Sequence, residues 1–166
     1  MEASTKPGLT TRIHEIYIKA PQGQIWEAIT SAEWTQKYGY GAAIEVDLKT
    51  GGSCCYKASA EMKSFGLPDT IIDGEVLEVD PPRKLVHSYR WLFSETNRAE
   101  GFTRVTWEIE PTEAGFCRLV VTHEIEHAPI MAAATVAKFD KRGGGGWNWI
   151  LSDLKSLLET GKRMSD

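Results

Sequence analysis

The segment WNWILSDLKSLLETG, residues 147–161, decides the fold class of this 166-residue chain. Its apolar residues recur at spacings of three and four, which is the period of an amphipathic helix. They are Trp147, Ile150, Leu151, Leu154, Leu157 and Leu158. Gly161 follows them and is typical of a helix end. So wide an apolar face must be buried against a large partner, which the rest of the chain has to supply.

The residues before this helix predict a sheet that can serve as that partner. Alternating apolar segments, separated by glycine and proline turn signals, predict strands at 12–20, 44–48, 54–60, 70–79, 84–93, 102–110 and 117–126. One helix is expected at 22–30, and a second short helical turn at 31–38. The sequence therefore predicts an α+β fold, in which a curved antiparallel sheet of about seven strands wraps around the long C-terminal helix.

Length and composition indicate a single globular domain over residues 11–162, with short tails at 1–10 and 163–166. The net charge is −4 and the basic residues are scattered, so nucleic acid is not an expected partner. No apolar run is long enough to span a bilayer, no secretory signal is recognisable, and a cytoplasmic location is expected. The odd set Cys54, Cys55 and Cys117 predicts free thiols.

Alternation along the later strands predicts an aromatic inner face that includes two histidines. A curved sheet closed by one helix does not always fill its middle, so we expect a cavity for a small molecule. The predicted ligand-binding residues are Tyr56, His87, Tyr89, Trp91, Trp107, His123, Trp147 and Leu151. The aromatic residues would form the walls and the histidines the polar contacts. The alternative is a solid core, in which each histidine is satisfied by a carbonyl or hydroxyl group.

Two other motifs are expected to carry no chemistry. His123-Glu124-Ile125-Glu126-His127 matches the zinc-hydrolase pattern, which needs a helix so that both imidazoles reach one ion. In the predicted strand the two histidines would lie about 13 Å apart, so no metal site is predicted. The glycine run 143–146 lacks the lysine of a phosphate loop, and we interpret it as a flexible hinge beside the cavity.

Three strings resemble the family named for the activator of Hsp90 ATPase homologue, within the START-like superfamily. They are IWEAIT at 25–30, GEVLEVDPPRKLV at 74–86, and the run from Trp147 through Leu151 to LKSLLETG at 154–161. The resemblance covers residues 12–162 and implies a helix-grip fold with a small-molecule cavity. Gly39, where an aromatic residue is usual, and Asn148, where a proline is frequent, depart from the pattern.

This resemblance implies non-enzymatic binding of a small apolar or aromatic molecule, without a cofactor, and it allows a homodimer. One alternative is a cyclase-like or hydrolytic enzyme in which His87 or His123 moves a proton. No Gly-x-Ser-x-Gly nucleophile motif accompanies these histidines. The other alternative is a co-chaperone module. That activity belongs to longer family members with an additional Hsp90-binding domain, so Hsp90 is not an expected partner.

Overall fold

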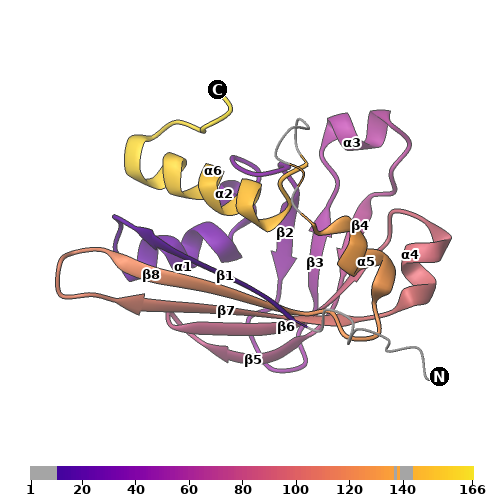
Figure 1. Ribbon diagram of the computed structural model, residues 1–166, viewed down its shortest axis with the longest axis horizontal. Coiled ribbons are helices and arrows are strands. Elements are labelled where there is room, and N and C mark those ends of the chain that lie inside the picture. Colours follow the sequence, from indigo (N-terminus) through magenta and orange to yellow (C-terminus); the bar gives the residue numbers. More distant parts are fainter. Residues whose placement is uncertain (1–10, 137, 139–143) are drawn as a thin grey trace, which may run out of the picture.

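The computed structural model describes residues 11–136, 138 and 144–166, which fold into one sheet and a set of helices (Figure 1). The strands in this part of the chain are β1 (Thr11–Ile18), β2 (Ala43–Val46), β3 (Cys54–Lys57), β4 (Thr70–Asp73), β5 (Val76–Asp80), β6 (Lys84–Trp91), β7 (Thr103–Pro111) and β8 (Cys117–Glu124). The helices are α1 (Gln22–Thr30), α2 (Ala32–Thr35), α3 (Ala60–Ser64), α4 (Glu95–Glu100), α5 (Pro129–Ala134) and α6 (Trp147–Thr160).

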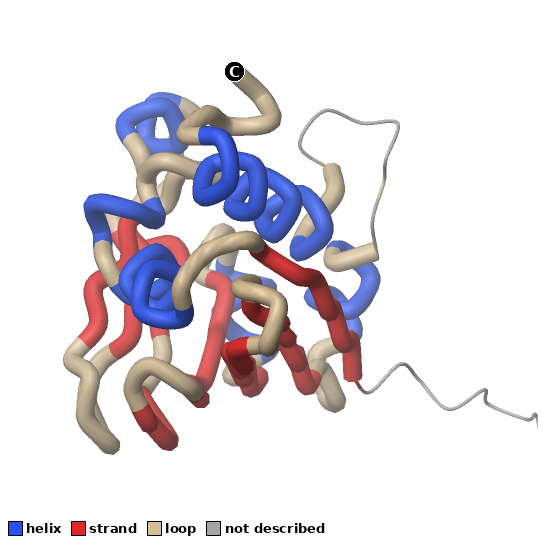
Figure 2. The backbone as a smooth tube through the Cα atoms, turned by 90° about the vertical axis from the view of Figure 1, so that its left-hand side faces the viewer, coloured by secondary structure: helices blue, strands red, loops and turns tan. Residues whose placement is uncertain are grey.

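The strands form one antiparallel sheet in the order β1-β8-β7-β6-β4-β3-β2, with β5 paired to β6 outside this path. Helix α6 crosses above the strands, which curve beneath it (Figure 2). Three short helices, α3, α4 and α5, gather at one end of the sheet (Figure 1). The predicted α+β class, with an antiparallel sheet around the C-terminal helix, is confirmed.

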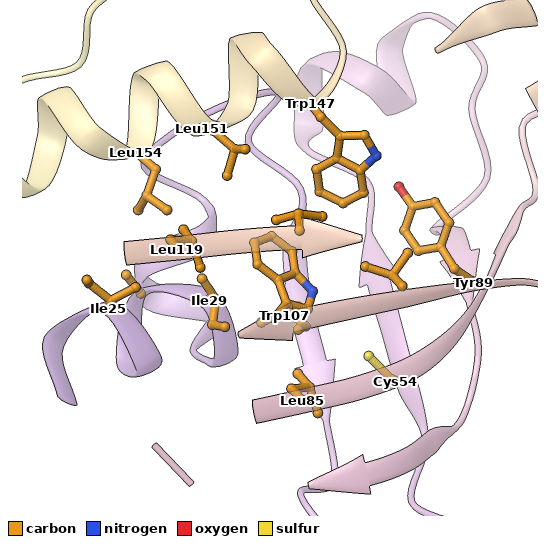
Figure 3. Packing of buried hydrophobic residues seen from close by; sticks show 14 of the residues in the cluster. Ile25, Ile29, Cys54, Leu85, Tyr89, Trp107, Leu119, Trp147, Leu151 and Leu154 are labelled. Carbon is orange, nitrogen blue, oxygen red and sulfur yellow. The ribbon is translucent and has the colours of Figure 1, made fainter. Parts of the chain in front are cut away.

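The buried core joins α6 to the sheet and to α1. Leu151 and Leu154 of α6 are 1% and 0% exposed, and Figure 3 shows both side chains directed from the helix toward Leu119 of β8. Ile25 and Ile29 of α1 lie beside them and are equally buried. The apolar period of α6 therefore exists because one face of this helix covers the sheet. Within the described residues, no helix has both the length and the hydropathy that crossing a membrane requires.

The strand predicted at 70–79 is divided into β4 and β5, which corrects the expected strand number. Regular pairing stops at Gly74 and Glu75, where the Glu75 amide donates to the side-chain oxygen of Ser88 at 2.8 Å. A Cβ atom on Gly74 would overlap the carbonyl oxygen of Ser88. Alternation hid this break because the strand resumes on the same edge of β6, so the apolar pattern continues through it.

Short helices also occupy segments in which the sequence predicted strand or loop. The strand expected at 54–60 ends at Lys57, and the side chain of Ser59 then accepts a hydrogen bond from the Met62 amide at 3.2 Å and caps α3. Within the loop expected at 128–142, helix α5 forms with its first amides bound by the Glu100 carboxylate. Residues 137 and 139–142 of that loop lie outside the described part of the chain.

Candidate functional site

A cavity of about 400 Å³ lies between the sheet, the start of α6 and the loops around α2 and α5. Among the described residues that line it, none carries a charged side chain. The aromatic residues on its wall are Tyr38, Tyr40, Tyr56, Tyr89, Trp91, Phe93, Trp107 and Trp147. Cavities of this size accept small organic molecules, and such a lining favours uncharged ones.

The cavity brings together five of the eight residues that the sequence predicted as ligand contacts. Tyr56, Tyr89, Trp91, Trp107 and Trp147 lie on its wall, and they come from β3, β6, β7 and α6. The other three lie off the wall, namely His87, His123 and Leu151. All three are almost completely buried, because they pack between the wall residues and the core.

The aromatic wall residues pack against one another, which holds their rings in place without a ligand. The ring of Trp147 lies 5.4 Å from that of Trp107 at an angle of 80°, and 6.1 Å from that of Tyr89. Tyr56 meets Tyr89 edge-on at 6.4 Å. Such pairs add stability beyond the area they bury. Figure 3 shows Trp147 at the start of α6, above Trp107 and beside Tyr89.

His87 lies behind the wall and holds Trp107. The indole Nε1 of Trp107 donates to Nε2 of His87 at 3.2 Å. The other ring nitrogen, Nδ1, lies 3.0 Å from the carbonyl oxygen of Ser88. A carbonyl oxygen can only accept, so Nδ1 carries the proton and Nε2 is the acceptor. Both nitrogens of His87 are thus occupied inside the protein.

His123 holds Trp147 in the same way through its other nitrogen. The indole Nε1 of Trp147 donates to Nδ1 of His123 at 3.1 Å. The hydroxyl of Thr103 lies 2.8 Å from Nε2 of His123 and donates its own proton to the carbonyl oxygen of Tyr89 at 2.8 Å. Nε2 must therefore carry a proton and donate to Thr103. The chain of bonds ties the start of α6 to β6, β7 and β8.

Burial keeps both histidines uncharged. It lowers the pKa of His87 from 6.5 to about 4, although a hydrogen bond to the backbone of Ser88 opposes the shift. Burial also lowers the pKa of His123, to about 3, and the positive charge that His87 carries when protonated lowers it further. At neutral pH each ring therefore has one donor and one acceptor nitrogen, and each is used.

The polar side chains of the wall include the tyrosine hydroxyls and those of Thr35 and Thr135. Burial raises the pKa of Tyr89 to about 12 and raises that of Tyr56 well above its usual value, so both remain protonated at neutral pH. The hydroxyl of Tyr38 is already committed, since it donates to the carbonyl oxygen of Ala28 at 2.8 Å. Tyr40 accepts a hydrogen bond from the amide of Gly146 at 3.1 Å.

The loop that follows α2 closes the cavity beside α6, and a buried carboxylate holds it there. Asp153 is 0% exposed, and its Oδ2 accepts from the amide of Gly39 at 2.9 Å and from Nε of Arg163 at 3.1 Å. Arg163 also donates to the carbonyl oxygen of Gly39 at 3.3 Å. Sequence reasoning missed this cluster. The signal was an aspartate within the apolar arc of the helix, between Leu151 and Leu154.

Parts of both motifs that were expected to carry no chemistry lie beside Trp147, since His123 accepts from its indole and Gly146 precedes it in the chain. His123 and Glu124 end β8, whereas His127 lies beyond the strand with a side chain that is 90% exposed, so the predicted strand contains only the start of the motif. Among the described residues, no three potential metal ligands gather at one point. Of the glycine run, residue 143 lies outside the described part of the chain, while Gly144 and Gly146 line the cavity.

A curved antiparallel sheet, a C-terminal helix across it and a cavity between them define the helix-grip class of START-like proteins. The sequence profile described as "Activator of Hsp90 ATPase homolog 1-like protein" matches residues 19–159, and the chain belongs to this family. No curated protein sequence matches the chain.

Solved structures with the same fold share little sequence with this chain. An Aha1 dimer from Colwellia psychrerythraea has 18% identity and a TM-score of 0.60, and the match covers 93% of this chain and 99% of that one. An HSP90 activator from Plasmodium falciparum has 21% identity and a TM-score of 0.55, over 94% and 91% of the two chains. CalU16 from Micromonospora echinospora has 18% identity and a TM-score of 0.50, and the match covers 68% of this chain and 59% of CalU16. At identities this low, the comparisons show a shared fold alone.

Proposed function

We propose that this protein binds a small, neutral, apolar or aromatic molecule and does not transform it chemically. The observation that carries the proposal is the cavity of about 400 Å³, whose described lining contains eight aromatic residues and no charged side chain. A charged ligand would lose its hydration there without gaining a counter-charge, whereas a flat neutral ligand would stack on rings that are already in place. The ligand contacts proposed are Tyr56, Tyr89, Trp91, Trp107 and Trp147.

A pair of related fluorescent probes tests the proposal. N-phenylnaphthylamine is neutral, and anilinonaphthalene sulfonate has a similar body with a fixed negative charge. We expect titration to give saturable, one-to-one binding of the neutral probe and much weaker binding of the sulfonate. Native mass spectrometry should also show a neutral compound that stays bound to the purified protein, or one that an added neutral compound displaces. Absence of binding across neutral aromatic, apolar and lipid libraries would contradict the proposal.

A variant with a filled cavity tests whether the probe binds inside the cavity. Ala42 is partly buried on the cavity wall, so Ala42→Phe puts a ring into the space that the ligand needs. Ala133 is exposed on α5 and is absent from the wall, so Ala133→Phe is the matched control. We expect Ala42→Phe to weaken binding of N-phenylnaphthylamine by at least about tenfold and Ala133→Phe to leave it unchanged. Equal affinities in both variants would locate the binding elsewhere.

An enzymatic role for the histidines receives no support from the geometry. A general acid or base must come within hydrogen-bond reach of the ligand, and neither His87 nor His123 is on the cavity wall. Both nitrogens of each ring already have partners, and the lowered pKa values keep the rings neutral. The enzyme alternative predicts a turnover that is lost in folded His87→Gln or His123→Gln variants, and detection of such a turnover would replace the binding proposal.

Activation of Hsp90 is the alternative that the family name raises. The HSP90 activator from Plasmodium falciparum shares this fold at 21% identity, which is too low to transfer an activity. We expect no pull-down of Hsp90 and no change in its ATPase rate when this protein is added. Stimulation of that rate would favour the co-chaperone alternative over the binding proposal.

Self-association and location are further proposals that the sequence raised. The Aha1 structure from Colwellia psychrerythraea is a dimer, and β1 of this chain lies at the edge of the sheet with Ile13 and Tyr17 exposed by 66% and 50%. Light scattering coupled to gel filtration distinguishes a monomer from a homodimer.

The three cysteines are free thiols, which fits the proposed cytoplasmic location.

A further inference from the structure

Two of the residues that line the cavity are tryptophans whose N–H groups donate to side chains outside it. Trp107 and Trp147 both line the cavity, yet their indole nitrogens donate to buried histidines at 3.2 Å and 3.1 Å. An indole has one donor and no acceptor. Each ring therefore presents only carbon to a ligand, although tryptophan is a residue that can bind a carbonyl group.

The histidines that receive these bonds are themselves fixed in one tautomer. Ser88 supplies a carbonyl oxygen to Nδ1 of His87, and Thr103 supplies a hydroxyl to Nε2 of His123, which leaves the remaining nitrogen of each ring as the acceptor. Both rings are buried, at 1% and 0% exposure. Neither indole can turn its N–H toward the cavity without leaving a buried acceptor unpaired, which is costly.

The donors left on the aromatic wall are therefore tyrosine hydroxyls, chiefly those of Tyr56 and Tyr89 on the sheet side, and the indole N–H of Trp91, which bonds to the side chain of Tyr89. A ligand carbonyl placed against the tryptophans would be buried without a partner, which should weaken binding by roughly tenfold. A hydrocarbon part of the same ligand would suffer no such loss. The wall is thus divided into a region at Trp107 and Trp147 without donors and a region at Tyr56 and Tyr89 with them.

We infer that His87 and His123 are positioning residues that set ligand selectivity by holding the N–H groups of Trp107 and Trp147 away from the cavity. This inference rests on the proposed binding function and adds to it a mechanism of discrimination. The accepted ligand has an apolar, acceptor-free face against Trp107 and Trp147. Removal of either histidine acceptor frees an indole donor and relaxes this preference.

Two probes of similar shape measure the preference. Acetonaphthone has a carbonyl oxygen where isopropylnaphthalene has a methyl group. The ratio of their affinities therefore reports whether the cavity wall offers a hydrogen-bond donor at that point. We expect His87→Leu and His123→Leu to raise the ratio in favour of the ketone by about tenfold. His87→Gln and His123→Gln retain an acceptor oxygen and should keep the ratio close to that of the unmodified protein.

Two variants serve if the leucine variants do not fold. Trp107→Phe and Trp147→Phe remove the donors but keep an aromatic ring. Because both rings are proposed ligand contacts, the affinity for each probe should change, but the ratio of the two affinities should not, because the ligand does not contact those donors. A selective loss of ketone binding in either variant would overturn the inference. An unchanged ratio in folded leucine variants would overturn it as well.

Nitrogen-proton spectra of the indole groups test the positioning without any ligand. We expect the Trp107 signal to move in His87→Leu and the Trp147 signal to move in His123→Leu, each with faster exchange with water. Signals that stay in place would refute the role of the histidines. Binding of neither probe to the unmodified protein would instead refute the proposed function, so the two failures are distinguishable.

Discussion

The two buried histidines show how single residues decide the polarity of a cavity that they do not touch. His87 and His123 are neutral because burial lowers their pKa values to about 4 and about 3. A protonated imidazole has no acceptor nitrogen, so it could no longer accept the hydrogen bond from the indole N–H of Trp107 or Trp147. The same residues therefore link the stability of the fold to pH, since the unfolded chain takes up protons that the folded chain excludes.

Acid should destabilise the protein through these residues. Both histidines are neutral above pH 6.5 in the folded and unfolded states, so their contribution to stability is complete there. As pH falls from about 6.5 toward 4, the unfolded state is protonated first, and His87 alone should cost about 3 kcal/mol of unfolding free energy. Urea denaturation at several pH values measures this slope.

A pair of variants isolates the histidine contribution from that of the carboxylates. His87→Gln removes the titrating group and should flatten the slope between pH 6.5 and 4. The control is His127→Gln, because the side chain of His127 is 90% exposed. If the two variants lose stability with the same slope, the buried histidine is not the source.

Asp153 is a second residue whose role depends on burial. Its carboxylate is 0% exposed and accepts from the Gly39 amide, from Arg163 and from the Met164 amide at 2.8 Å. An amide side chain has one acceptor oxygen instead of two and cannot satisfy all three donors. We expect Asp153→Asn to lower the free energy of unfolding by about 2 kcal/mol in urea denaturation.

The surroundings of Asp153 supply the comparisons. Arg163→Gln should cost less than about 1 kcal/mol, because the Arg163 side chain is 34% exposed and water can replace it. Glu33→Gln is the control, since the Glu33 side chain is 75% exposed and pairs with Lys37 at 3.8 Å. An Asp153→Asn variant as stable as the Glu33→Gln variant would show that the buried cluster is not required.

At the scale of elements, α6 ends where its backbone has to reverse. Gly161 adopts a left-handed conformation with φ of +79°, and its amide donates to the carbonyl oxygen of Leu157 at 2.9 Å. A side chain is disfavoured in this conformation. The sequence predicted this end correctly because a glycine after an apolar helical period is a strong local signal.

Two glycine substitutions should therefore change stability in opposite directions. Gly161→Ala should lower the unfolding free energy by about 1 kcal/mol. Gly23 is exposed in α1 with no atom near its missing side chain, so Gly23→Ala should raise it by roughly 0.5–1 kcal/mol. Thermal unfolding monitored by circular dichroism compares the two, and a stabilising Gly161→Ala would contradict the assigned cap.

The helices that sequence reasoning missed are all short. Helices α3, α4 and α5 have five or six residues each, too few for an apolar period to emerge. Ser59 and Ser94 precede two of them and cap them, which was a local signal that alternation in the neighbouring strands outweighed. The first amides of α5 are bound by Glu100, a residue distant in sequence, and the local signal for its start was Pro129 at the first helical position.

At the scale of the whole molecule, the cavity makes stability depend on the ligand. A molecule that binds only the folded state stabilises it by mass action, by about 2.7 kcal/mol at a concentration one hundred times its Kd. We expect N-phenylnaphthylamine to raise the free energy of unfolding of the unmodified protein, measured by urea denaturation, by this amount. The shift should vanish in Ala42→Phe, whose cavity is filled. A shift of equal size in that variant would mean that the probe binds outside the cavity.

The sequence by itself determined the fold class and the inward faces of α6 and of the later strands. Helical period in α6 and alternation in β6, β7 and β8 depend on neighbours along the chain, so they predicted which side chains face inward, Tyr89, Trp107 and Trp147 among them. Only the tertiary structure decided that His87 and His123 stand behind this wall and that Asp153 joins α6 to the loop at Gly39. Those arrangements depend on distances between segments far apart in the chain, and periodicity within one segment contains no information about them.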